Sequence, residues 1–175
     1  MVIIIKDVKR FFMDWIVPIA VAVVLALAIN KFLIFKIYVP TSSMYPTIKP
    51  GDRIMSSRIH NVSKLNRGDI VVFYSDELGE TLVKRLIGLP GDKIDIKPDG
   101  IVFINGEKYD EPYVKNKDLR SGEFEVPKDS YFFLGDNRKD SKDSRYWRNP
   151  YITKDKIMGK ALFVIYPFNR IGGLK

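Results

Sequence analysis

The feature that most constrains the fold is an uncharged apolar run near the start of the chain, from Trp15 to Asn30. By itself the run is shorter than the roughly 20 residues that a helix needs to cross a bilayer. Lys31 interrupts it, and the apolar residues 32–35 follow. Because a lysine near the end of a span can extend its side chain to the membrane interface, the whole segment is long enough to cross. We therefore predict a transmembrane anchor over residues 11–35.

Two other interpretations of this segment are a cleavable signal peptide and a buried core helix. A signal peptide would need a small-residue cleavage site, but no A-x-A pattern follows Ala28 and apolar residues continue beyond Lys31. A core helix of a small domain is apolar on one face, whereas this segment is apolar all round. The pattern favours a retained anchor.

The charge distribution bears on partners and on topology. The formal net charge is +8, and such a chain is attracted to nucleic acid or to anionic lipid headgroups. The basic residues are interleaved with acidic ones, without helix-turn-helix or zinc-finger spacing, so we expect a lipid membrane and no nucleic acid as partner. Three basic residues precede the anchor: Lys6, Lys9 and Arg10. They favour a single-pass protein of the cell membrane with residues 1–10 in the cytoplasm and residues 36–175 outside.

Beyond the anchor, the pattern becomes strand-like. Short runs rich in β-branched and aromatic residues recur between glycine and proline breaks. Asn105-Gly106 is typical of a tight hairpin, and the polar stretch 107–129 is predicted as loops. Many short strands with such turns predict a mainly β fold for residues 36–175, an antiparallel, barrel-like sheet. The expected strands are residues 52–59, 69–74, 81–87, 93–97, 101–104, 131–134 and 158–166.

The composition excludes several kinds of site. The chain has no cysteine and one histidine, so it has no disulfide, no thiolate nucleophile, and no zinc site built from cysteines or paired histidines. A carboxylate site for Mg²⁺ or Ca²⁺ at Asp136, Asp140 and Asp143 stays open, although these residues lack EF-hand spacing. We expect no metal and no cofactor.

Two residues can supply hydrolytic chemistry without a metal. The first is Ser43, in Ser43-Met44-Tyr45-Pro46-Thr47, where the proline favours extended backbone over helix. The second is Lys84, which strand alternation places on the same face as Leu82 and Leu86. If that face is buried, desolvation lowers the pKa of the lysine, and its neutral amine can take a proton from the serine. Arg85 stays protonated and cannot act in this way.

Two further features leave alternatives open. His60 can serve as the base of a Ser-His-Asp triad, but it lies in a polar stretch typical of an exposed loop. The polar segment 135–147 is typical of a solvated loop as well. It nevertheless contains Asp143 and Arg145, which can form an ion pair, and Ser141, whose hydroxyl can hold a lysine amine.

Together and in this order, three segments resemble the motifs of bacterial type I signal peptidases, the leader peptidase family. Ser43-Met44-Tyr45-Pro46-Thr47 is similar to the nucleophile motif of that family, and residues 84–92 are similar to its general-base motif. The third motif is similar to Gly135-Asp136-Asn137-Arg138 with the following Ser141, Asp143, Ser144 and Arg145. The upstream anchor agrees with the family too, so the resemblance covers nearly the whole chain.

The resemblance implies a membrane-anchored serine endopeptidase that cleaves signal peptides from exported preproteins. By this resemblance, Ser43 would attack the scissile carbonyl and Lys84 would act as the base. Ser141 would orient the lysine, and Asp143 with Arg145 would brace the site. The family is specific for small residues at the first and third positions before the cut.

The resemblance also implies an oxyanion hole, formed by the backbone N–H of Ser43 and a hydroxyl two residues before it. That position is Thr41, where some members have serine; a threonine keeps the hydroxyl, but its methyl group restricts χ1. Independently of the family, eight residue steps separate Phe35 from Ser43, a reach of roughly 26 Å when extended. A nucleophile so close to the anchor suits a substrate whose signal segment lies in the membrane.

Two alternatives to a signal peptidase stand beside this interpretation. Self-cleaving SOS-repressor domains have a similar Ser/Lys pattern, but they carry a DNA-binding region where this chain has its apolar segment. A membrane-tethered β-domain that binds partners without catalysis is the alternative of a different class. It predicts no turnover and no labelling of Ser43 by a serine-directed acylating inhibitor.

Overall fold

The computed structural model describes residues 10–174. Of the predicted cytoplasmic segment, Lys6 and Lys9 lie outside the described residues and only Arg10 lies within them. The chain divides into two compact units, Met1–Phe35 and Lys36–Lys175.

Most of the described part of the first unit is one continuous helix. It includes a π-helical segment, η1 (Phe12–Ile16), which continues as the α-helix α2 (Val17–Phe32). This stretch of 21 residues contains an 18-residue window with a mean hydropathy of 2.4 and has no buried side chain, so it is long and apolar enough to cross a membrane. The amide of Asn30 donates to the carbonyl of Ala26 at 3.0 Å, which satisfies a polar group that lipid cannot.

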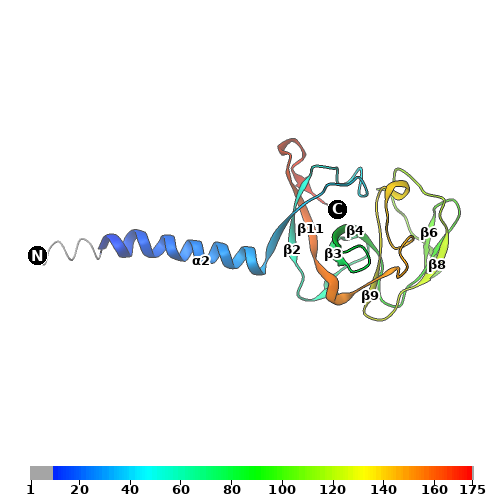
Figure 1. Cartoon of the computed structure of the whole chain (residues 1–175), viewed down its shortest axis with the longest axis horizontal. Helices are drawn as coiled ribbons and strands as arrows, with labels where there is room; N and C mark the ends of the chain where they lie inside the picture. Colours follow the sequence, from blue (N-terminus) through cyan, green and yellow to red (C-terminus); the bar gives the residue numbers. More distant parts are fainter. Residues whose placement is uncertain (1–9, 175) are drawn as a thin grey trace, which may run out of the picture. The chain divides into compact units, whose positions relative to one another are not determined.

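The second unit is mainly β, as predicted, and its larger sheet has eight strands. Seven follow the order β1-β2-β11-β3-β4-β9-β10, and β12 pairs with β11. The pairings from β2 to β10 are antiparallel. Figure 1 shows β2, β11, β3 and β4 side by side in this sheet. The bounds are β1 (Ile34–Tyr38), β2 (Arg53–Arg58), β3 (Ile70–Ser75), β4 (Glu80–Gly88), β9 (Ser130–Leu134), β10 (Tyr151–Thr153), β11 (Ile157–Tyr166) and β12 (Gly172–Gly173).

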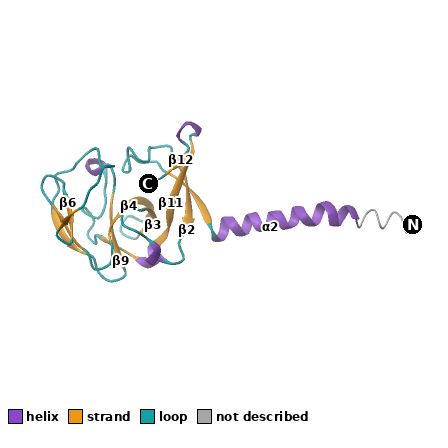
Figure 2. Cartoon of the chain, turned by 180° about the vertical axis from the view of Figure 1, so that it is seen from behind, coloured by secondary structure: helices purple, strands orange, loops and turns teal. Residues whose placement is uncertain are grey.

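A smaller sheet has four strands in the order β7-β6-β5-β8. Asn105 and Gly106 both have positive φ, 54° and 86°, as the central residues of a type I′ hairpin require. The predicted hairpin at this position is therefore confirmed. Figure 2 shows that loops, not long helices, connect the strands of the second unit. The bounds are β5 (Lys93–Ile96), β6 (Val102–Ile104), β7 (Glu107–Lys108) and β8 (Gly122–Glu125).

All seven predicted strands are present, and their ends agree within one residue. The structure also has strands that were not predicted, among them β10 and β12, and two further regions differ from the prediction. Residues 107–129 were expected as loops only, but they contain β7 and β8, short strands that add to the edges of β6 and β5. Residues 34 and 35 were expected at the end of the anchor, whereas the helix ends at Phe32 and β1 begins at Ile34.

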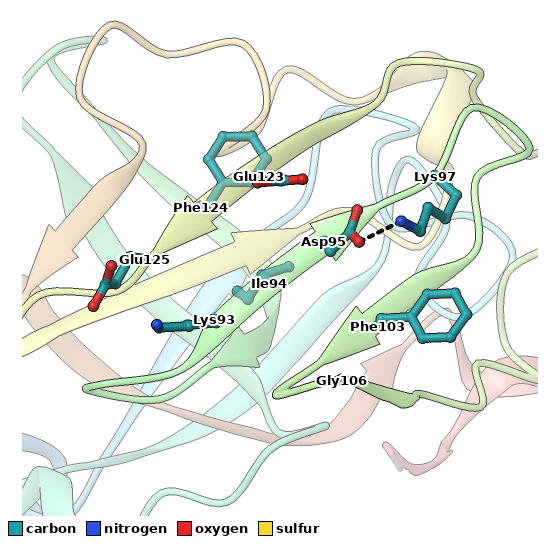
Figure 3. Close-up of a pocket in the computed structure, with 9 residues that line it drawn as sticks. All are labelled: Lys93, Ile94, Asp95, Lys97, Phe103, Gly106, Glu123, Phe124 and Glu125. Atoms are coloured by element: carbon teal, nitrogen blue, oxygen red, sulfur yellow. Dashed lines mark ion pairs between the residues drawn. The ribbon is translucent and has the colours of Figure 1, made fainter.

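The two faces of the small sheet differ. One face packs against β9 through apolar side chains that include Ile94 and Val102. The other face forms a hollow of about 700 Å³ (Figure 3), where Lys97 and Asp95 form an ion pair at 2.5 Å beside Phe103. None of the predicted site residues lines this hollow.

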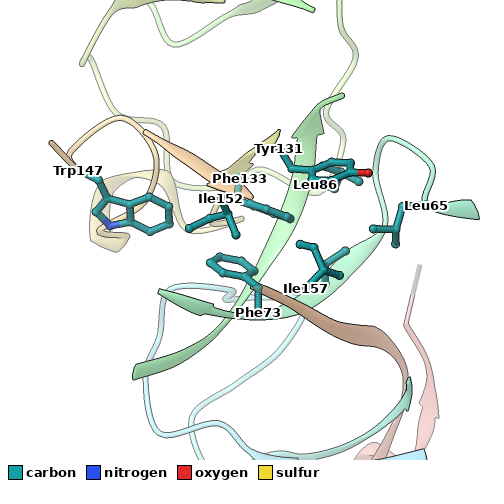
Figure 4. Packing of buried hydrophobic residues seen from close by; sticks show 9 residues of the cluster. Leu65, Phe73, Leu86, Tyr131, Phe133, Trp147, Ile152 and Ile157 are labelled. Atoms are coloured by element: carbon teal, nitrogen blue, oxygen red, sulfur yellow. The ribbon is translucent and has the colours of Figure 1, made fainter. Parts of the chain in front are cut away.

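Two apolar clusters of the main sheet hold the segment that contains Trp147 and the turn that contains Met44 and Ile48. In Figure 4, the rings of Phe73 and Phe133 stack with centroids 4.3 Å apart, and Trp147 packs edge-on against Phe73. Trp147 thereby ties the segment after the third motif to the core. In a separate cluster, Met44 and Ile48 are fully buried against residues of β2, β3 and β11.

Three Gly-Asp pairs form the same turn. Gly51, Gly68 and Gly91 have φ between 87° and 92°, a region that glycine enters at little energetic cost. In each turn the following aspartate accepts the backbone N–H three residues before it, at 2.6–3.0 Å. Each of these carboxylates also binds a distant cation, in the pairs Asp52–Arg170, Asp69–Lys160 and Asp92–Arg67. These turns directly precede β2, β3 and β5.

Candidate active site

Ser43 lies in a turn between β1 and β2, with 7% of its surface exposed. The buried side chains of Met44 and Ile48 anchor the turn, and Ile48 N donates to the Met44 carbonyl at 2.9 Å. The hydroxyl of Thr41 lies 3.4 Å from the Ser43 hydroxyl. The turn therefore holds two hydroxyl groups side by side.

Lys84 lies within β4, opposite Val71 of β3, and only 3% of it is exposed. Burial removes water from the ammonium and lowers the pKa of Lys84 from 10.5 to about 8, against the opposing effect of nearby Asp143. Within residues 10–174, no ion pair engages this ammonium. The side chain therefore loses its proton near pH 8 rather than near 10.5.

Gly135 is the point at which the predicted site residues converge. Arg85 pairs with Leu134 in the β4–β9 ladder, so one further step places Gly135 opposite Lys84, on the same side of the sheet. A Cβ atom at Gly135 would lie 2.2 Å from the Ser141 hydroxyl oxygen and 2.5 Å from the Ser43 carbonyl oxygen. The absent side chain therefore leaves the space that Ser43 and Ser141 occupy beside Lys84. Within the described residues, the Ser141 hydroxyl is buried without a hydrogen-bond partner.

The expected ion pair between Asp143 and Arg145 is present. The guanidinium binds the carboxylate through two contacts, at 2.8 and 2.9 Å, and both residues are buried. The same carboxylate accepts the backbone N–H of Gly135 at 3.0 Å. The pair therefore fixes the peptide beside Lys84.

Comparison with known proteins assigns the chain to a family. The family described as signal peptidase, peptidase S26, matches residues 12–166. The chain belongs to this signal peptidase family. It is 39% identical to signal peptidase I S of Bacillus subtilis (strain 168), over 93% of this chain and 94% of that protein. It is 37% identical to signal peptidase IB of Staphylococcus aureus (strain Mu50), over 92% and 93% of the two chains.

One solved structure in the comparison is the crystal structure of a signal peptidase I from Enterococcus faecalis V583. The two sequences are 32% identical, the match covers 57% of this chain and 98% of that one, and the TM-score is 0.48.

A buried ion pair that the sequence pattern does not predict joins all three signal peptidase motifs. Arg85, next to the candidate base, binds Asp136 of the third motif through contacts at 2.8 and 2.6 Å. Thr47, four residues after the candidate nucleophile, donates to the same carboxylate at 2.5 Å. Each motif contributes one residue to this network. The presence of all three residues within the motifs was therefore the sequence signal from which the network could have been predicted.

The third motif also clamps the turn of Ser43 through its backbone. Asn137 N donates to the Ser43 carbonyl at 3.0 Å, and its side-chain amide donates to the Ser42 carbonyl at 3.1 Å. The Ser42 hydroxyl donates to Asp140 at 2.5 Å. The turn and the third motif therefore form one hydrogen-bonded unit.

The structure shows where the residues considered for a metal site or a histidine base lie. The carboxylates considered for a metal are engaged elsewhere, Asp136 by Arg85 and Asp143 by Arg145. Within residues 10–174, no cluster of three potential ligands is suited to a metal. His60 is exposed beyond the far end of β2, and the six residues of that strand span ~20 Å from the end near the Ser43 turn.

Replacement of Thr47 by valine tests the Arg85–Asp136–Thr47 link. The variant keeps the shape of the side chain but leaves one buried carboxylate oxygen without its hydroxyl donor. We expect a loss of about 1–2 kcal/mol in unfolding free energy and roughly tenfold in kcat. Thermal unfolding and a cleavage assay measure the two effects. Thr47→Ser keeps the donor and is expected to retain both properties; parental activity in Thr47→Val would contradict the link.

Proposed function

We propose that this chain is a membrane-anchored serine endopeptidase that removes signal peptides from exported preproteins, with Ser43 as nucleophile and Lys84 as base. The observation that carries the proposal is the burial of a lysine whose pKa is lowered to about 8, beside the space that Gly135 leaves open to Ser43 and Ser141. Family membership supplies the reaction class.

In the proposed reaction, the neutral amine of Lys84 takes the Ser43 proton as the serine oxygen attacks the scissile carbonyl carbon. The resulting ammonium then protonates the amine of the leaving mature chain. Water, deprotonated by the same lysine, attacks the acyl-enzyme carbonyl. The bond to the Ser43 oxygen then breaks, the lysine returns the proton to that oxygen, and the signal peptide is released with a free carboxylate. The unpaired Ser141 hydroxyl has the role of holding the lysine amine in line with the serine.

The tetrahedral intermediate carries a negative oxygen that needs donors. We assign these donors to the Ser43 N–H and the Thr41 hydroxyl, which lies 3.4 Å from the nucleophile. A donor of this kind typically contributes about 10²–10³ in kcat. The Asp143–Arg145 pair has the supporting role of fixing the peptide of Gly135.

The apolar helix supports an enzyme that is anchored in the membrane by a transmembrane segment. We propose that residues 11–35 form the anchor, that residues 1–10 face the cytoplasm and that residues 36–175 work outside it, because basic residues precede the anchor. The partners are then the lipid membrane and the signal peptides of preproteins, and we expect none among nucleic acids.

Cleavage of a preprotein by the full chain tests this function. In detergent, the parent is expected to cut after small residues at the first and third positions before the bond, whereas Ser43→Ala is expected to be inactive. His60→Ala is the matched control and should cleave normally. In sealed right-side-out vesicles, preprotein added outside should be cut without detergent. Cleavage by Ser43→Ala would exclude the nucleophile, and an inactive, unlabelled parent would favour the tethered binding domain.

A further inference from the structure

The connection between β7 and β8 reaches from the small sheet to the third motif. We call residues 111–118 of this connection the brace segment. Four of its side chains contact residues of the second and third motifs: Glu111 pairs with Arg138, the ring of Tyr113 lies 3.8 Å from the Arg85 guanidinium, the Asn116 amide donates to Asn137 at 2.9 Å, and Asp118 pairs with Arg145 at 2.8 Å. The sequence pattern predicts only loops here.

The contacts matter electrostatically because the arginines are buried. Arg138 and Arg145 are 3% and 5% exposed, and a buried guanidinium without a countercharge strongly destabilises its surroundings. Glu111 is the carboxylate that pairs with Arg138 among the described residues, and Asp118 adds a second countercharge to Arg145 beside Asp143. The conformation of the third motif therefore depends on charges supplied by the small sheet.

Both arginines act on the backbone of one residue, Gly135. Arg138 Nε donates to the Gly135 carbonyl at 3.0 Å. Arg145 holds Asp143, whose carboxylate accepts the Gly135 N–H at 3.0 Å. The Gly135 carbonyl is thus held by Arg138, whose charge Glu111 neutralises. The Gly135 N–H is held by Asp143, which is bound by Arg145, the partner of Asp118. Gly135 also adjoins the Ser43 carbonyl and the Ser141 hydroxyl.

We propose that Glu111 and Asp118 are positioning residues for catalysis: through Arg138 and Arg145 they fix Gly135, and with it the alignment of the reacting groups. The inference rests on the proposed function, because it concerns the geometry of that same site. Neither carboxylate is assigned a contact with substrate. Their removal should therefore change the rate of the chemical step more than substrate binding.

The test uses Asp118→Asn and Glu111→Gln in the full detergent-solubilised chain. Both variants keep the side-chain shape and remove the charge. In Asp118→Asn, Arg145 keeps Asp143 as a partner, so the fold should persist. In Glu111→Gln, the amide oxygen can still accept from Arg138 but the countercharge is lost, so this variant should also lose stability. We expect kcat to fall about 10–100-fold with KM within about twofold of the parent, since a displacement of ~1 Å can reduce rates 10²-fold. Asp118→Glu restores the charge and should recover part of the loss. Leu119→Ala, at a neighbouring side chain that is 74% exposed, is the matched control and should behave as the parent.

Active-site titration with a serine-directed acylating inhibitor separates positioning from stability. If the brace segment only stabilised the fold, the fraction of reactive Ser43 would fall while kcat per reactive serine stayed at the parental value, and that result would overturn the proposal. A fall in kcat per reactive serine supports it. Parental turnover in both charge-removing variants would sink this inference alone, whereas a parent that cleaves no preprotein would sink the proposed function.

Discussion

Replacement of Lys84 by methionine is expected to abolish cleavage and, at neutral pH, to make the folded protein more stable. Methionine fills the same buried space without a charge, and it has no amine to accept the serine proton. In the parent, folding removes the Lys84 ammonium from water, and this burial lowers the stability of the folded state. Activity and stability should therefore change in opposite directions.

The stability gained in Lys84→Met should depend on pH, because the pKa of Lys84 is lowered in the folded parent. Below pH 8 both folded and unfolded states are protonated, and the folded state is destabilised by about 3 kcal/mol, from a pKa lowered from 10.5 to about 8. Between these two values the folded state loses the proton while the unfolded state keeps it, so the parent becomes more stable as pH rises. The advantage of Lys84→Met should shrink over that interval and vanish above it.

Unfolding in detergent at several pH values measures the stability difference, and the cleavage rate of the parent supplies the matching kinetic measurement. The kcat/KM of the parent should rise with pH through a limb near 8, because this parameter reports ionisations of the free enzyme. Lys108→Met, at an exposed strand position, should alter neither property. A less stable Lys84→Met at pH 7, or one that still cleaves, would refute a buried lysine base.

Gly135→Ala is expected to reduce kcat at least 100-fold while leaving a folded protein. The new methyl group would meet the Ser141 hydroxyl at 2.2 Å and the Ser43 carbonyl at 2.5 Å, so both must move by about 1 Å. Backbone strain is not the cause, since φ at Gly135 is not positive. Overpacking of this kind typically lowers stability by about 1–3 kcal/mol.

Two other glycines give matched controls for this steric effect. A methyl group at Gly173 has open space, so Gly173→Ala should behave as the parent. A methyl group at Gly88 would meet Ile94 at 2.5 Å and Phe132 at 2.8 Å in the core, so Gly88→Ala should lose stability but keep its kcat per folded molecule. If Gly135→Ala resembled Gly88→Ala in kinetics, the convergence on Gly135 would have no catalytic meaning.

Local pattern was sufficient to predict most of the fold. Strand alternation is a property of successive residues, and Asn105-Gly106 requires nothing beyond two positive φ values. β1 was not predicted, because its first apolar residues continue those of the N-terminal apolar segment without a break. β8 was missed because Gly-Glu-Phe-Glu has one strong strand former and depends on pairing with β5.

The polar network of the site depends on contacts that the local pattern does not encode. Arg85 and Asp136 are 51 residues apart, Thr47 and Asp136 are 89 apart, and Asp118 lies 27 residues from Arg145. Each residue occurs in a context that also suits a solvated loop. The motifs indicated the candidate site residues, but the partners that hold these residues could be identified only from the tertiary structure.

The chain leaves the main sheet after β4, forms the small sheet and returns at β9. β4 and β9 are neighbouring strands, and their register brings Gly88 beside Phe132. The two ends of the intervening chain therefore meet, and lengthening it adds only about 0.6 kcal/mol of closure entropy per doubling. A change in the length of this connection should therefore leave β4 and β9, the strands on which Lys84 and Gly135 are placed, paired as they are. In the described part of this connection, the brace segment supplies the carboxylates that pair with Arg138 and Arg145, so changes in length should be tolerated best away from it.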